Sequence, residues 1–187
     1  MATTDKINCD IRNKLLSELI ADTLPDYNKA NRVGQRLLSN PDEYNLTHLV
    51  EKSLAHSSEG LYKFIDEAHK DNDDGSEDKT GTIYKVKRPK YTAAWAEISN
   101  VRSEYGTLKE GAIRCVILNP FLEKLHFIFI PKDAVKQLMT TKDGNNTKSK
   151  SAYLSYNVAD QSFTKCCDRY GLIEVSTLKQ LAKIKNH

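Results

Sequence analysis

The sequence predicts an α+β fold in which a helical N-terminal part packs on a central mixed, mostly antiparallel β-sheet. Apolar residues recur at helical spacing over the first 70 residues, the period changes to two after an acidic segment, and two hairpins follow. The 187 residues, of which 39% are hydrophobic, are enough for one compact domain. We divide this domain into a helical part (1–70), a sheet core (71–139) and a C-terminal loop and helix (140–187).

The helical part is expected to contain three helices. In the first, apolar residues recur every four positions at Ile7, Ile11, Leu15 and Leu19, and Pro25 ends the pattern. A second, shorter helix is expected over residues 28–38, before a Ser-Asn-Pro breaker. A third begins after Asn45, and its apolar pattern resumes over 61–68 beyond Gly60.

The sheet is expected to contain two hairpins. Residues 82–87 and 91–99 alternate with a period of two and are joined by a turn at 88–90. Residues 112–118 and 125–130 are apolar on both faces, which is typical of strands in the middle of a covered sheet.

The C-terminal part gives weaker signals. Pro131 is placed to begin a helix, and the polar residues 140–151 indicate a surface loop. A short edge strand over 172–175 and a basic helix over 177–184 are expected to close the chain.

An acidic segment separates the helical part from the sheet. Between residues 66 and 78 it contains seven carboxylates, Asp66, Glu67, Asp71, Asp73, Asp74, Glu77 and Asp78, and we expect it to be a loop. It does not fit a calcium-binding EF-hand loop, because aligning Gly75 with the invariant glycine places Lys70 and Gly81 where carboxylates are required. The segment leads directly into the first expected strand. Carboxylates and a lysine at such a place suit metal-dependent phosphodiester cleavage, in which carboxylates hold Mg²⁺ and an ammonium group stabilises negative charge.

The tripeptide Glu77-Asp78-Lys79 resembles the acidic-x-Lys half of the PD-(D/E)XK nuclease superfamily, with Asp73 or Asp74 as the preceding acidic residue. Residues 111–139 resemble the paired central strands and helix that follow the catalytic hairpin in many restriction enzymes, so the resemblance covers about residues 66–139. In that superfamily the first acidic residue and the acidic-x-Lys element usually lie on separate strands, whereas here they are almost contiguous in the sequence.

The resemblance implies a restriction-endonuclease-like fold and Mg²⁺-dependent cleavage of double-stranded DNA. It makes Asp74, Glu77 and Lys79 the primary catalytic residues, and Asp74, Glu77 and Asp78 the metal ligands. An alternative alignment takes Asp78 as the first acidic residue and Glu97-Ile98-Ser99 as a second element that lacks its lysine, which makes Glu97 a further catalytic candidate. Because one active site cuts one strand, the resemblance also implies a homodimer.

Basic residues crowd the turn of the first hairpin. Lys85, Lys87, Arg88 and Lys90 are the candidate DNA-binding residues, and Tyr84 and Tyr91 are interleaved with them. A two-stranded ribbon fits the major groove of DNA, where lysine and arginine neutralise phosphates. The formal net charge of +3 is too small to identify a nucleic-acid-binding protein by itself.

Two other functions remain open. The chain is alternatively a non-catalytic DNA-binding or regulatory protein that uses the basic hairpin, or a protein-interaction module without nucleic acid. No zinc-site spacing relates Cys9, Cys115, Cys166 and Cys167, and no nucleotide-binding glycine motif is present. No apolar leader or long apolar run occurs, so we expect a cytoplasmic protein.

Overall fold

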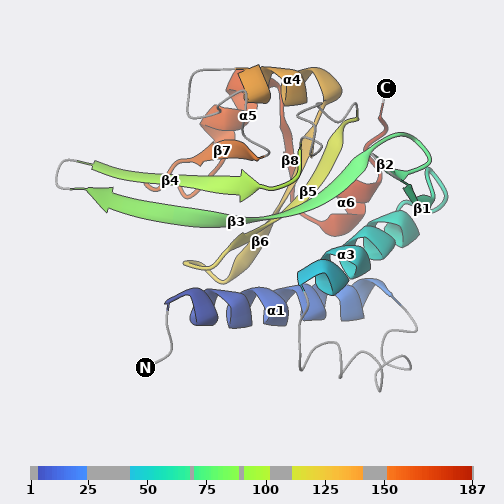
Figure 1. The fold of residues 1–187 in the computed structure, drawn as a ribbon, viewed down its shortest axis with the longest axis horizontal. Helices are drawn as coiled ribbons and strands as arrows, with labels where there is room; N and C mark the ends of the chain where they lie inside the picture. The colour runs from blue at the N-terminus through green and yellow to red at the C-terminus, as the bar shows by residue number, and fades with distance from the viewer. Residues whose placement is uncertain are drawn as a thin grey trace.

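The computed structural model describes residues 4–24, 43–67, 70–88, 91–101, 111–140 and 151–186. In these residues, helices cover both faces of a curled, mixed β-sheet, so the fold is α+β as the sequence predicts (Figure 1). The helices are α1 (Thr4–Thr23), α3 (Glu43–Ser57), α4 (Lys132–Thr140), α5 (Thr164–Tyr170) and α6 (Leu178–Ala182). None of these helices is both long enough and apolar enough to cross a lipid bilayer.

Six of the described strands form one sheet in the order β7-β4-β3-β5-β6-β8. They are β3 (Glu77–Arg88), β4 (Tyr91–Ile98), β5 (Ile113–Asn119), β6 (Lys124–Ile130), β7 (Ala152–Tyr156) and β8 (Ile173–Val175). Four of the five neighbouring pairs are antiparallel, and β3 and β5 are parallel. The two predicted hairpins, β3–β4 and β5–β6, are therefore confirmed.

The sheet has a separate apolar core on each face. Leu16 and Ile20 of α1 pack with residues of α3 and α6 against Val116 of β5. On the other face, α4 and α5 pack against Cys115 and Ile117 of the same strand. Since side chains alternate along a strand, odd-numbered residues of β5 face α4 and α5 and even-numbered ones face α1, α3 and α6.

Two short strands, β1 (Phe64–Glu67) and β2 (Lys70–Asn72), form an antiparallel ribbon beside the start of β3. The prediction that helical structure resumes over 61–68 is therefore wrong, and so is the interpretation of the whole acidic segment as a loop. Helix α3 ends at Ser57, and Glu59 and Gly60 then adopt positive φ values of 57° and 88°. This backbone conformation turns the chain out of the helix before β1 begins.

Several other predictions can be compared with the structure. The helix after Pro131, the short strand near 172–175 and the final helix are present as α4, β8 and α6. The helix expected over 28–38 lies outside the described residues, as does most of the loop at 140–151. Strand β7 and helix α5 were not predicted from the sequence.

The turn before β3 packs closely against the start of β5. A Cβ atom added to Gly111 would lie 2.1 Å from the carbonyl oxygen of Gly75, whereas one added to Gly75 would meet nothing within 4 Å.

We expect Gly111→Ala to lower the free energy of unfolding by about 2–3 kcal/mol, because the backbone must move. Gly75→Ala, at a φ of 79°, is expected to cost only about 1 kcal/mol. Urea unfolding checks both values, and equal losses would contradict the close approach.

Candidate functional site

A lysine lies between two carboxylates at the start of β3. The ammonium of Lys79 donates a hydrogen bond to Glu77 Oε2 at 2.5 Å and another to Asp71 Oδ2 at 3.4 Å. Glu77 and Lys79 are two residues apart on β3 and therefore share one face of the strand, whereas Asp71 comes from β2. We call these three residues the acid–lysine cluster.

The acid–lysine cluster is largely removed from water. The exposed fraction of the side chain is 1% for Glu77, 13% for Lys79 and 15% for Asp71. Burial alone would lower the pKa of Lys79, but the charges and hydrogen bonds of Asp71 and Glu77 outweigh it and raise that pKa. Lys79 is therefore a cation at neutral pH, suited to stabilising negative charge and not to accepting a proton.

A second polar group is centred on Arg114, whose side chain is fully buried. Its guanidinium donates to Asp74 Oδ2 at 2.9 Å, to the carbonyl oxygen of Ile184 at 3.1 Å and to the hydroxyl of Ser76. It also lies 3.8 Å from the centre of the Tyr62 ring. Although burial alone would raise the pKa of Asp74, the hydrogen bonds from Arg114 and Ser76 lower it.

Asp78 points to the opposite face of the sheet from Glu77 and Lys79. Its register partner on β5 is Arg114, while Lys79 is paired with Cys115. The Asn72 amide donates to Asp78 Oδ2 at 3.0 Å, and Asp78 Oδ1 has no hydrogen-bond partner among the described residues. Complete burial raises the pKa of Asp78 to about 7, against the opposing effects of the Asn72 hydrogen bond and the charge of Arg114.

The structure separates the three carboxylates that the sequence suggested as metal ligands. Asp74 binds Arg114, Asp78 binds Asn72 on the other face, and Glu77 binds Lys79. In the part of the chain that the structure describes, no group of three or more acidic, histidine or cysteine side chains could hold a metal ion.

The carboxylate that joins Glu77 is Asp71, which the sequence did not single out. Both carboxylates already bind one cation, the ammonium of Lys79. Mg²⁺ is usually bound by one or two carboxylates together with waters and substrate phosphates, and Asp71 and Glu77 are the two carboxylates that meet at Lys79. Asp71 is one of seven acidic residues in its segment, and its position on β2, beside the start of β3, brings it to Lys79.

Glu97 lies apart from the acid–lysine cluster. It is paired with Thr82 across the β3–β4 hairpin, on the face of the sheet to which Asp78 also points. Its Oε1 accepts a hydrogen bond from the hydroxyl of Tyr153 at 3.4 Å. The alternative alignment through Asp78 and Glu97 therefore places both residues on the sheet face opposite Glu77.

Of the four candidate DNA-binding residues, the structure describes the side chain of Lys85. Its ammonium lies 4.3 Å from the centre of the Phe121 ring in the turn between β5 and β6. The side chains of Lys87 and Arg88, and the whole of Lys90, lie outside the described residues.

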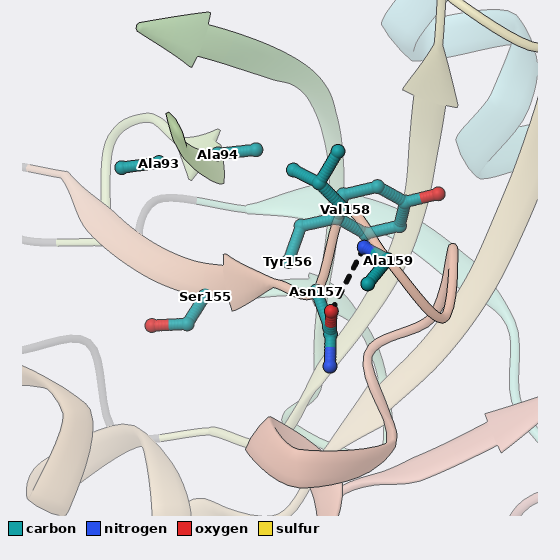
Figure 2. Close-up of a pocket in the computed structure, with 7 residues that line it drawn as sticks. All are labelled: Ala93, Ala94, Ser155, Tyr156, Asn157, Val158 and Ala159. Atoms are coloured by element: carbon teal, nitrogen blue, oxygen red, sulfur yellow. Dashed lines mark hydrogen bonds between the residues drawn. The ribbon is translucent and has the colours of Figure 1, made fainter. Parts of the chain in front are cut away.

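A hollow of about 560 Å³ lies away from the acid–lysine cluster, and Ala94 in its wall pairs with Lys85 across the β3–β4 hairpin. Figure 2 shows it lined by Ala93 and Ala94 of β4 and by residues 155–159 at the end of β7. The side-chain oxygen of Asn157 accepts a hydrogen bond at 3.0 Å from the backbone N–H of Ala159, which also lines the hollow. No residue predicted from the sequence to act in catalysis lines this hollow, and none of its lining residues is charged.

No protein-family model matches the chain, and no curated protein and no solved structure matches it. The contacts and charges described above are therefore the basis for assigning a function.

Replacement of Arg114 tests how strongly the fold depends on its buried charge. Arg114→Met leaves Asp74 without its cation and removes the hydrogen bond to Ile184, so we expect it to lower the free energy of unfolding by about 3–5 kcal/mol. Arg114→Lys keeps the charge but not the planar fork of donors, and it should recover only part of this loss. Urea unfolding measures both variants, and full recovery by lysine would contradict the importance of the fork.

Asp78 should make the protein less stable as the pH rises. The folded chain keeps Asp78 protonated up to about pH 7, whereas the unfolded chain releases this proton near about pH 4. Between these values the folded state binds more protons, so the contribution of Asp78 to stability falls with pH and levels off above pH 7. We expect Asp78→Asn to raise the free energy of unfolding at pH 8 by about 2–4 kcal/mol relative to wild type, and by little at pH 4. A pH-independent difference in urea unfolding would refute this assignment.

Proposed function

We propose that this chain is a Mg²⁺-dependent endonuclease with a restriction-endonuclease-like fold, and that it cleaves double-stranded DNA at the acid–lysine cluster. The observation that carries the proposal is the position of the Lys79 ammonium between the carboxylates of Glu77 and Asp71. Asp71 lies on β2 and the Glu77-x-Lys79 element lies on β3. This arrangement is similar to the PD-(D/E)XK pattern, in which the first acidic residue and the acidic-x-Lys element come from separate strands.

The burial of so many charges supports a functional role for this end of the sheet. Glu77, Asp78 and Arg114 each have at most 1% of their surface exposed. Charged side chains are almost never buried to this extent, because removing them from water costs several kcal/mol each. Clusters of buried, interacting charges of this kind are concentrated at active sites.

Each residue of the cluster has a distinct part in the proposed reaction. Asp71 and Glu77 would hold the ion, and burial of Glu77 fixes the direction of its carboxylate. Mg²⁺, when bound, polarises the scissile phosphate and acidifies a water molecule. Lys79 remains protonated and stabilises the negative charge that develops on the phosphate, an interaction that is strong because the site is poor in water.

The same strand connects the cluster to the basic hairpin. β3 begins beside β1 and β2 with the cluster and runs across the molecule to the hairpin turn (Figure 1). Lys79 and Lys85 are six residues apart, which corresponds to about 20 Å along a strand. Between Ile83 and Trp95 the sequence has four basic and no acidic residues. This charge pattern favours a polyanionic partner such as DNA, and two copies of the chain would cut its two strands.

One observation favours the non-catalytic alternative. Both carboxylates of the cluster are already engaged by Lys79, so the cluster could act as a structural ion pair in a DNA-binding protein. The test of catalysis separates these two functions.

Cleavage of supercoiled plasmid DNA tests the proposal. We expect the wild-type protein to nick the plasmid with Mg²⁺ and not with a chelator. Glu77→Gln and Lys79→Gln should each lower the rate by about 100-fold or more, while DNA binding without Mg²⁺ is retained. Glu97→Gln is the matched control, since it removes a charge on the opposite face of the sheet and should leave the rate unchanged.

Two results would overturn the catalytic assignment. One is a wild-type protein that binds DNA but does not cleave it with Mg²⁺, which would support the non-catalytic alternative. The other is unchanged cleavage by Glu77→Gln and Lys79→Gln when circular dichroism shows that both variants are folded.

A further inference from the structure

The turn between β5 and β6 presents two apolar side chains to water. Phe121 is 45% exposed and Leu122 is 38% exposed, and both belong to the small set of large hydrophobic residues on the described surface. Their neighbours Glu123 and Lys124 are also exposed. Exposed aromatic and aliphatic side chains next to each other are typical of binding surfaces.

A buried asparagine fixes this turn. Asn119 has no exposed surface, and its amide donates to the hydroxyl of Tyr156 at 2.9 Å. Its side-chain oxygen accepts a hydrogen bond from the backbone N–H of Phe121 at 3.1 Å. The backbone at Phe121 is therefore held from inside the protein, and the ring is displayed on a fixed support.

A cation accompanies the exposed ring. The ammonium of Lys85 lies 4.3 Å from the centre of the Phe121 ring, so the basic β3–β4 hairpin and the β5–β6 turn meet at this point. With this ammonium over one face of the ring, the opposite face is the one left for a base, and the ring and the ammonium together supply the two contacts that a nucleotide needs, one for the base and one for the phosphate. Glu123 is the acidic residue of the turn, and it is outnumbered by the four basic residues of the ribbon.

We propose that Phe121 stacks on an unpaired base of the bound nucleic acid while Lys85 binds the adjoining phosphate. This inference rests on the nucleic-acid substrate of the proposed function. A fully paired duplex shields the faces of its bases except at its ends, and inserting a ring between two of its base pairs costs a few kcal/mol of unstacking, so a ring on a turn stacks most readily on a base that has left the helix. The protein should therefore prefer DNA that contains unpaired nucleotides.

Phe121 is a binding residue in this proposal and takes no part in the chemistry. Phe121 lies next to Lys85, and Lys85 is six residues from Lys79 along β3, which corresponds to about 20 Å. Its replacement should therefore change the affinity and the KM for DNA, and it should leave kcat unchanged.

Binding is measured by fluorescence anisotropy without Mg²⁺, using a fully paired duplex and the same duplex with a central bulge of unpaired nucleotides. We expect wild type to bind the bulged duplex more tightly. Phe121→Ala should weaken binding to the bulged duplex about tenfold and affect the paired duplex little. Phe121→Trp should restore the affinity, because tryptophan also stacks.

Lys85→Gln provides an independent readout. It should lower the slope of log affinity against log salt concentration by about 0.7–0.9, the value for one lost phosphate contact. Phe121→Ala should leave this slope unchanged, because stacking releases no counterion.

The outcomes distinguish this inference from the proposed function. Cleavage by wild type together with equal affinity of Phe121→Ala for the bulged duplex overturns the stacking role alone. A bulge preference that depends on Phe121, in a protein that does not cleave, supports stacking and overturns catalysis. Absence of binding to either duplex overturns both.

Discussion

A fully buried guanidinium holds together the parts of the chain that surround the candidate site. Arg114 lies in β5, and its hydrogen bonds reach Asp74 in the turn before β3 and Ile184 in the C-terminal segment. Its guanidinium also covers the ring of Tyr62, which follows α3. A charge without water is tolerated only when hydrogen-bonding and charged partners surround it. These distant segments must therefore meet at Arg114, and the start of β3, which carries the acid–lysine cluster, is positioned as a result.

The register of β3 gives consecutive charged residues different environments. Its parallel pairing with β5 directs Glu77 and Lys79 to one face and Asp78 to the other. Lys79 thus meets both Glu77 and Asp71, while the side chain of Asp78 meets Asn72. Asp71 links the two groups, because its carboxylate binds both the Lys79 ammonium and the backbone N–H of Asp78 at 2.7 Å. The same strand continues to the basic turn of the β3–β4 hairpin, which relates the proposed chemistry to the proposed DNA contact.

The elements that could be predicted have a strong local pattern, and those that could not lack one. The strands β5 and β6 are mostly apolar, and the turn between them contains Pro120. By contrast, α5 is seven residues long and buries only Cys166, so its sequence has no apolar stripe. The sequence over 61–68 has helical spacing, yet residues 64–67 form β1, because the chain turns away from α3 at Glu59 and Gly60 and Phe64 pairs with Asn72 of β2. Here a tertiary contact overrides a weak local preference.

The sequence by itself determined that an acidic-x-Lys element precedes a strand and that basic residues crowd the hairpin turn at the end of that strand, because both features are local and follow from residue types and a period of two. Only the tertiary structure decided that Asp71, and not Asp74, joins Glu77 and Lys79. The two aspartates are three residues apart in the same acidic segment and are equivalent by composition. They are distinguished by Arg114, which lies 40 residues from Asp74 in the sequence. The buried charge of Arg114 requires a carboxylate partner, and Asp74 supplies it. Asp71 is therefore the aspartate that binds Lys79.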